Sequence, residues 1–374
     1  MKFTSLKENL KQGLSIVGHL TTKNINLPIL NNILFKVKKE GIELISTNLE
    51  ISISHFLRSK IESEGEFIVD SKIISEYINL LPDDKIDFEV LNDSLVVSCK
   101  NHKTKINTQE SKDFPIIPKV KSENKFIVDV LDLKKGLSSV IFSVSNNENR
   151  IEISGVLFSF LNKKLTIVGT DSYRLAERVV DFNGDQVDEV KNIIIPSKTI
   201  QEVVRILNNF KEDESLDDLK NIEIYTNENQ ISFVFGSTVL ISRLILGNYP
   251  DYKQIIPEKE KISLKINKAE ITKALKVAGI FSKTGINDVG ISVKDKKVSV
   301  FSSSSNVGEN SINVNSDTLG GDVEIFVNYK YVLEGLNNIS SESVSLIFND
   351  NNSPCKIYSE DEPNFLYIVM PIRQ

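Results

Sequence analysis

Apolar and polar residues alternate along much of this chain, and at six places the alternation gives way to a helical period. In residues 41–47 and 221–226, apolar side chains recur mostly at every second position, as in a strand with one buried face. In the first helical stretch, Leu6, Leu10 and Leu14 share one stripe. The pattern predicts helices over residues 5–18, 72–81, 131–142, 197–208, 268–280 and 328–338.

The passage from a short apolar strand into an amphipathic helix occurs three times at domain-sized spacing. Phe3, Phe126 and Ile262 hold the same place in the three copies, at intervals of 123 and 136 residues (126 − 3 and 262 − 126). These intervals are far longer than a solenoid repeat. We therefore predict three tandem domains, over residues 1–120, 125–250 and 258–374.

Each predicted domain has a second half of the same kind as its first. Apolar strands that end just before residues 72, 197 and 328 again run into helices. Proline and charged residues at 115–124 and 257–261 predict linkers, and the acidic segment 211–218 predicts a solvated loop. Many alternating strands with six covering helices favour an α+β fold of three tandem domains, each two strand-helix-strand half-repeats with antiparallel sheets.

The composition is that of a folded, water-soluble protein. The chain has 374 residues, of which 40% are hydrophobic and 26% charged. It contains no apolar run long enough to span a bilayer, and no signal-peptide core follows Met1, so we expect it in the cytoplasm. Cys99 and Cys355 fall in different copies and are expected to be buried, reduced thiols.

The sequence offers no catalytic constellation, cofactor motif or metal site. His19, His55 and His102 lack a cysteine or carboxylate at metal-ligand spacing, so we expect them on the surface or in turns. A Gly-rich phosphate loop, HExxH and GxSxG are all missing. Residues 171–174 combine an acid, a hydroxyl, a phenol and a guanidinium, but no base is placed beside them by spacing. A protein without catalytic activity is favoured over an enzyme with an unrecognised site.

Lysine recurs on all six predicted helices, although the formal net charge of the chain is −6. On any single helix, an exposed lysine is ordinary. If the six helices face one axis, however, their lysines line it with positive charge, which suits the phosphates of duplex DNA. Such contacts are independent of base sequence.

Several short blocks, in the same order along the chain, resemble the bacterial sliding clamps, the β subunits of DNA polymerase III. The blocks are Met1-Lys2-Phe3-Thr4, Leu27-Pro28-Ile29-Leu30 with Asn32, Asp113-Phe114-Pro115, residues 169–176, Tyr249-Pro250-Asp251-Tyr252, Asn328 with Tyr331 and Val332, and residues 367–373. Their order, combined with the threefold repeat, makes the resemblance specific.

The resemblance implies a DNA sliding clamp, a processivity factor that acts in DNA replication without chemistry of its own and needs no cofactor. Two copies would join head to tail into a homodimeric ring of six domains, with helices lining a channel around duplex DNA. The implied partners are a clamp loader, the α subunit of the replicative polymerase and other proteins with clamp-binding peptides, in the cytoplasm and at the nucleoid during replication. A β-rich peptide-binding scaffold that does not encircle DNA is the alternative.

The resemblance also implies a pocket for partner peptides, a DNA channel and a dimer interface. The pocket positions are Ile153, Thr170, Ser172, Tyr173, Arg174, Leu175, Pro250, Ile255, Ile286, Asn328, Tyr331, Ile368, Met370, Pro371, Ile372 and Arg373. The channel positions are Lys7, Lys11, Lys23, Lys72, Lys134, Lys198, Lys273 and Lys276. The interface positions are Lys103, Lys105, Ile106 and Glu309.

Some positions depart from the family pattern. Gln254 stands where the family often has a basic residue, and Asn352 and Pro354 where a small apolar residue and a hydroxyl residue are expected. Ser197 replaces a basic residue of the channel. We therefore expect the peptide preference to differ from that of other family members. Because Glu309 is the one acid in its segment, residues 302–315, we also expect an interface that rests on strand pairing and apolar contacts.

Overall fold

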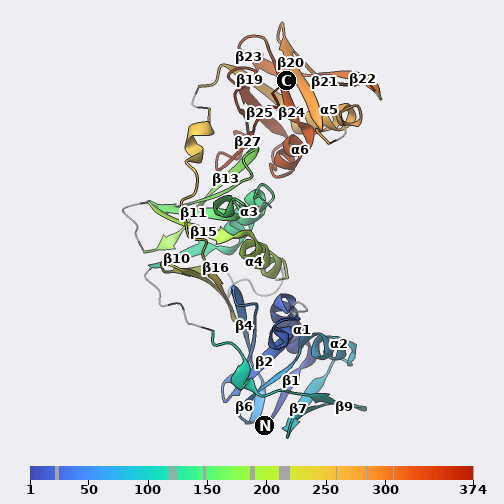
Figure 1. The fold of residues 1–374 in the computed structure, drawn as a ribbon, viewed down its shortest axis with the longest axis vertical. Coiled ribbons are helices and arrows are strands. Elements are labelled where there is room, and N and C mark those ends of the chain that lie inside the picture. The colour runs from blue at the N-terminus through green and yellow to red at the C-terminus, as the bar shows by residue number, and fades with distance from the viewer. Residues whose placement is uncertain are drawn as a thin grey trace. The chain divides into compact units, whose positions relative to one another are not determined.

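The computed structural model of the protein describes residues 1–21, 25–117, 120, 124–145, 149–185, 190–209, 220–257, 259–283, 285–305 and 307–373 (Figure 1). Lys23 and the predicted acidic loop, residues 211–218, lie outside them. The chain divides into two compact units. Unit 1 comprises Met1–Val130, Asn183–Asp185 and Glu202–Leu244, and unit 2 comprises Leu131–Phe182, Gln186–Gln201 and Ile245–Gln374.

Six strands of the described chain run directly into six α-helices. The pairs are β1 (Lys2–Leu6) with α1 (Lys7–Val17), β6 (Gly65–Asp70) with α2 (Ser71–Leu80), β10 (Asn124–Asp129) with α3 (Val130–Ile141), β15 (Lys191–Pro196) with α4 (Ser197–Asn209), β19 (Ile262–Asn267) with α5 (Lys268–Ile280), and β24 (Val323–Asn328) with α6 (Tyr329–Asn337). Each predicted helix is confirmed, with both ends within two residues of the observed bounds. Side-chain caps fix three of these junctions, since Asp70, Asn267 and Asn328 accept hydrogen bonds from the first turn of the helix that follows.

Unit 1 contains two antiparallel sheets. The larger has nine strands in the order β14 (Asn183–Gly184), β10, β16 (Asn221–Thr226), β17 (Gln230–Phe235), β18 (Thr238–Arg243), β4 (Ile51–Leu57), β3 (Gly41–Thr47), β2 (Asn32–Lys38) and β6. The smaller has the order β5 (Lys60–Ser63), β1, β7 (Lys85–Leu91), β8 (Ser94–Cys99) and β9 (His102–Asn107).

Unit 2 repeats this construction. Its nine-stranded sheet has the order β15, β11 (Gly155–Leu161), β12 (Lys164–Thr170), β13 (Arg174–Asp181), β27 (Phe365–Val369), β26 (Cys355–Tyr358), β25 (Ser343–Phe348), β19 and β23 (Ser316–Leu319). Its four-stranded sheet has the order β22 (Gly308–Val314), β21 (Lys297–Ser304), β20 (Asp288–Lys294) and β24. Short 3-10 helices lie between strands at Gly18–Leu20 (η1), Pro28–Asn31 (η2), Ser111–Asp113 (η3), Ile151–Ile153 (η4) and Tyr252–Ile255 (η6).

The central copy of the repeat is shared between the two units. Its strands β10, β14, β16, β17 and β18 lie in unit 1, whereas β11, β12, β13 and β15 lie in unit 2. The nine-stranded sheets are therefore continuous through two joints, the pairing of β4 with β18 and the pairing of β13 with β27. The α+β fold of antiparallel sheets is confirmed, while the predicted domain bounds stay a prediction.

Both cysteines are free and buried, as expected from the sequence. The prediction for His55 was wrong, because this residue lies in the buried strand β4, where its Nδ1 is 2.8 Å from the Thr238 hydroxyl. Burial lowers the pKa of His55 to about 4, so the ring is neutral near pH 7.

None of the helices described here has the length and apolar character needed to cross a membrane.

Candidate functional site

The joint between β13 and β27 brings together the two segments that carry most of the predicted pocket. Arg174 pairs with Val369 and Leu175 with Ile368 in an antiparallel ladder. Beyond β27, the Met370 N–H donates to the Tyr173 carbonyl at 2.8 Å. The Ile372 N–H then donates to the carbonyl of Phe326 on β24 at 2.7 Å. The tail after β27 thus runs beside residues 170–175 and onto the four-stranded sheet.

A tight turn before β13 presents Tyr173 to solvent. The Thr170 hydroxyl donates to the Arg174 carbonyl at 2.6 Å, and Asp171 Oδ1 accepts from the N–H groups of Tyr173 and Arg174 at 2.9 and 3.0 Å. Ser172 has a φ of 79°, a left-handed conformation that a non-glycine residue adopts only when its surroundings hold it. The Tyr173 side chain is 64% exposed as a result.

Arg174 connects this turn to helix α6. Its Nε donates to Asp171 at 3.0 Å, its Nη2 donates to the Phe142 carbonyl at 2.8 Å, and its Nη1 pairs with Glu334. The guanidinium also stacks on the Tyr331 ring, 4.4 Å from the ring centre. Of the five N–H donors of Arg174, a predicted pocket residue, these contacts engage three within the protein.

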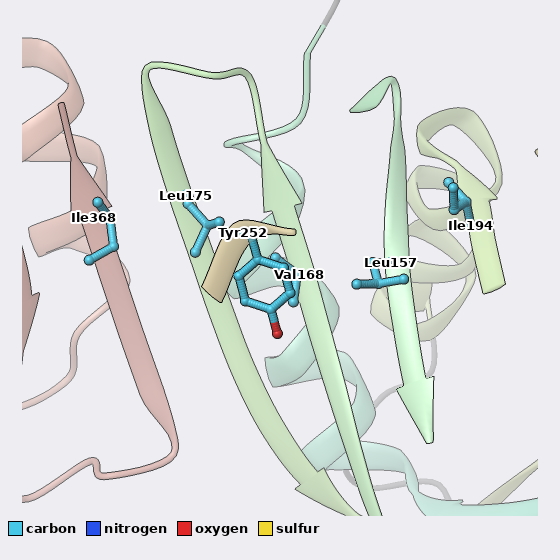
Figure 2. Close-up of a cluster of buried hydrophobic side chains, with 6 residues drawn as sticks. All are labelled: Leu157, Val168, Leu175, Ile194, Tyr252 and Ile368. Atoms are coloured by element: carbon cyan, nitrogen blue, oxygen red, sulfur yellow. The ribbon is translucent and has the colours of Figure 1, made fainter. Parts of the chain in front are cut away.

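The apolar floor of the predicted pocket is a buried cluster on one face of the nine-stranded sheet (Figure 2). It contains Leu157, Val168, Leu175, Ile194, Tyr252 and Ile368. Leu175 and Ile368, two of the predicted pocket residues, are both 0% exposed. The Tyr252 ring from η6 lies over the strands in Figure 2, and Ile255 packs against the same cluster. Burial raises the pKa of Tyr252 above its usual range, and Glu177 adds to the effect.

The remaining predicted pocket residues differ in how far they are exposed to solvent. Ile153 is buried, and its carbonyl shares the Ser145 N–H with the carbonyl of Thr170, at 3.2 Å each. Asn328 caps α6 through its side chain. The positions that solvent reaches at least in part are Ser172, Pro250, Ile255, Ile286, Tyr331, Met370, Pro371, Ile372 and Arg373.

Two residues at this site were missed by the sequence analysis. Arg150, just before η4, donates to the Ser172 hydroxyl at 2.7 Å and belongs to none of the resembling blocks. Tyr252 does lie in such a block, but only the structure shows that its ring covers the sheet. Gln254, noted as a departure from the family pattern, donates to Asp251 at 2.8 Å and so braces η6.

The predicted channel lysines differ in how much charge they offer to solvent. Lys11, Lys72, Lys198, Lys273 and Lys276 are exposed on their helices, and Lys134 is half-buried. The Lys7 side chain is only 11% exposed and pairs with Asp83 at 2.9 Å. Its charge is therefore largely neutralised within unit 1.

The predicted interface residues lie on two open sheet edges. In the described part of the chain, no strand pairs with the outer side of β9 or of β22. Lys103 and Lys105 on β9 and Glu309 on β22 are exposed. Ile106 is buried, with 8% of its surface exposed, so it offers little apolar surface to a partner. Lys100 lies in the turn before β9.

A second group of ion pairs connects strand β13, at the joint of unit 2, to helix α3. The Glu362 carboxylate pairs with Arg178 of β13 at 3.1 Å and with Lys135 of α3 at 3.2 Å, and it accepts from the Ser340 N–H at 2.5 Å. Burial alone would raise the pKa of Glu362. The Ser340 N–H and the two cations outweigh burial and lower the pKa to about 2.

Among the described residues, no three or more His, Cys, Asp or Glu side chains come together in a way that could hold a metal ion. The site is one of apolar surface, backbone edges and paired charges.

Comparisons with known proteins cover nearly the whole chain. Sequence models of the DNA polymerase III beta subunit match in order: the N-terminal domain over residues 1–118, the central domain over 128–251 and the C-terminal domain over 253–373. A beta sliding clamp of Halalkalibacterium halodurans is 28% identical over 389 residues, covering 100% of both chains. One of Streptococcus pneumoniae is 27% identical, covering 99% of this chain and 98% of the relative.

Solved structures agree. The crystal structure of a putative DNA polymerase III beta subunit from Eubacterium rectale has a TM-score of 0.91 at 28% identity, covering 100% of both chains. The Thermotoga maritima beta subunit has a TM-score of 0.89 at 27% identity, covering 100% of this chain and 99% of that one.

We expect Glu362→Gln to lower the free energy of unfolding at pH 7 by about 1–2 kcal/mol, because the amide leaves Arg178 and Lys135 without an anionic partner. A carboxylate with a lowered pKa stabilises the fold fully above its unfolded pKa, and this contribution disappears as the pH falls through its folded pKa. The difference between the two proteins should therefore be constant above about pH 5 and shrink toward pH 2. Denaturant titrations at several pH values measure it, and a difference independent of pH would contradict the assignment.

Proposed function

Because the chain belongs to the family of DNA polymerase III beta subunits, the bacterial sliding clamps, we propose that two copies close into a ring around duplex DNA. The protein is a DNA sliding clamp, a processivity factor of DNA replication with no catalytic chemistry of its own. The observation that carries this conclusion is that models of all three domains match one chain in the family's order. We expect it in the cytoplasm, and at the nucleoid during replication.

The helices supply the chemistry that a DNA channel needs. Exposed lysines stand on α1, α2, α4 and α5, where Lys11, Lys72, Lys198 and Lys273 are open to solvent. Lysine contacts to phosphate are weak, salt-dependent and blind to sequence, so they permit sliding. A closed ring stays on DNA by topology and needs no tighter contact. A peptide-binding scaffold that never surrounds DNA gives no reason for exposed lysines on these helices.

A topological clamp should be lost from DNA when the DNA is given ends. We expect the protein, placed on nicked circular DNA by a clamp loader and ATP, to remain bound to the circle and to slide off after a single restriction cut. Gel filtration of the labelled protein before and after the cut measures this. As a control, bulky proteins bound at both new ends should retain it. Equal retention on circular and cut DNA would argue against the ring.

The two open edges are the proposed contacts between copies. Strand β9 of one copy would pair with β22 of the other, which buries two rows of unpaired backbone groups. Lys103 and Lys105 would then lie near Glu309 of the second copy. Beside β9 lies a hollow of about 520 Å³, whose lining includes Ile73. Ile73 is 52% exposed and adds some apolar surface next to the edge, whereas Ile68 and Ile106 in the same lining are buried.

Reversing the charge of one edge should weaken the dimer without unfolding the protomer. For Lys103→Glu combined with Lys105→Glu, we expect a dimer dissociation constant about fivefold higher, with a smaller effect at high salt, because exposed ion pairs are weak and screened. Analytical ultracentrifugation measures it. The matched control is Lys60→Glu, which lies on the opposite edge strand β5 of the same sheet. An unchanged constant for the double variant would count against this interface.

Partner peptides are proposed to bind at the surface of the unit 2 joint. Ile255, Met370 and Ile372 are partly exposed around a floor that includes Leu175 and Ile368. Met370 is unbranched and polarisable, so it can adapt to several peptides. Proteins that carry such peptides are expected to include the polymerase α subunit and the clamp loader. Arg150 and Arg373 can meet their polar groups.

Met370→Ala should weaken the binding of a polymerase-derived peptide about tenfold, because it removes apolar contact at the centre of the proposed surface. Calorimetric titration measures the affinity, and ultracentrifugation should show an unchanged dimer. Leu319→Ala, an exposed apolar position on β23 at the far edge of the same sheet, is the control and should bind normally. Unchanged affinity for the Met370 variant would refute the pocket.

A further inference from the structure

The two nine-stranded sheets are equivalent position by position on the face away from their helices. In unit 1, Leu34 pairs with Ile68 on one side and Ile45 on the other. In unit 2, Leu157 pairs with Ile194 and Val168 in the same way. The register of the ladders therefore lets each residue of one face be assigned to its counterpart on the other.

The equivalence continues across the joints. Ser54 on β4 pairs with Ile45 and with Val239 of β18. Its counterpart Glu177 on β13 pairs with Val168 and with Leu366 of β27. By the same register, Ile241 of unit 1 corresponds to Ile368 of unit 2. Unit 1 thus carries, at its own joint, the counterpart of the surface where partner peptides are proposed to bind in unit 2.

The segments that cover the two faces differ in length. After Tyr249-Pro250, unit 2 inserts residues 251–254 before Ile255-Ile256, and the insertion carries Tyr252 onto the sheet. In unit 1, Phe114-Pro115 is followed directly by Ile116-Ile117. Phe114 and Ile117 still pack on Leu34, Ile45 and Ile68. Unit 1 therefore has no inserted residue at the position that Tyr252 occupies in unit 2.

That place is a groove of about 690 Å³ in unit 1. Its apolar lining includes Val234, Val239 and Ile241, all only half-buried, and Ile116, which is 95% exposed. A groove of this size accommodates more than one side chain. Exposed apolar surface beside a shaped hollow is the usual mark of a binding site rather than of a solvated face.

The lysines around the groove can meet an acidic occupant. Its lining includes Lys36, Lys38 and Lys112 together with Glu43 and Glu66. Lys112 pairs with Glu110 at 2.9 Å, but both side chains are exposed, and such a pair is weak enough to exchange for a carboxylate of the occupant. Lys38 lies 3.6 Å from Glu43. Ser54 stands where Glu177 lies near Tyr252 in unit 2, so an aromatic ring entering here does not face that carboxylate.

We propose that this groove docks a short segment of a partner protein: an aromatic anchor followed by aliphatic residues, with acidic residues between them. The anchor takes the position that Tyr252 occupies in unit 2, and the acidic residues meet the lysines of the rim. The site is separate from the proposed peptide surface at Met370, and the proposal does not depend on the ring.

The probe is a fluorescein-labelled peptide with the sequence of residues 249–257 in which Lys253 and Gln254 are both replaced by Glu. We expect saturable binding to the full chain, measured by fluorescence anisotropy. Ser54→Phe, which fills the groove, should weaken it at least tenfold, as should Val239→Glu. Met370→Ala should leave it within twofold. A peptide that also carries Tyr252→Ala should bind at least tenfold more weakly.

The matched control is Ser98→Phe, another half-buried serine, on β8 of the smaller sheet of unit 1, which should bind normally. Circular dichroism and thermal melts establish whether each variant is folded. If Val239→Glu does not fold, the result for Ser54→Phe alone decides whether the groove binds the peptide. The absence of saturation up to about 1 mM peptide, or a loss of binding on Met370→Ala, would overturn the proposal. So would a change in self-association on Ser54→Phe with peptide binding intact, since the groove would then belong to a second copy.

Discussion

The antiparallel pairing of strands across the two joints is the interaction on which the rest of this structure depends. Strands β4 and β13 would otherwise end their sheets with open rows of backbone donors and acceptors, which are prone to pair with other chains. Pairing with β18 and β27 satisfies those groups and merges consecutive repeats into continuous sheets. The position of the tail after Val369, and hence of Met370, follows from the second of these ladders.

Buried and half-buried ion pairs fix the helices around each joint. In unit 2, Arg174 connects the turn before β13 to α6, and Glu362 connects β13 to α3. In unit 1, Arg205 of α4 pairs with Glu202 and donates to the carbonyl of Ile16 on α1 at 2.8 Å. Such pairs are costly to break singly, because the remaining partner keeps a poorly solvated charge. They therefore specify one arrangement of helix against helix more than they add stability.

Local features of the fold could be predicted from the sequence because they depend on the spacing of apolar residues that lie close together in the chain. The six strand-to-helix junctions follow from apolar spacing within about twenty residues, and Asn267 and Asn328 mark two of them chemically. The joints could not be predicted in this way, since nothing near Leu175 indicates that its partner is Ile368. The burial of both residues under Tyr252 follows from that distant pairing.

The contacts of single polar residues could not be predicted from the sequence either. Arg150 donates to Ser172, and His55 lies opposite Thr238 of another repeat, with which its ring makes a hydrogen bond. In each case the neighbour lies on another element of the chain, 22 residues away for Ser172 and 183 for Thr238.

The distance between joint partners also bears on the order in which the protein folds. Leu175 and Ile368 are 193 residues apart in sequence (368 − 175), whereas the hairpins on either side of them close over a few residues. Loop-closure entropy makes the long connection less favourable than a six-residue one by about 3 kcal/mol, since each doubling of length adds about 0.6 kcal/mol. The hairpins should therefore form early and the joints late. Until they do, the newly made chain carries four additional unpaired strand edges, those of β4, β18, β13 and β27, and this is the stage at which it is most exposed to aggregation and to capture by chaperones.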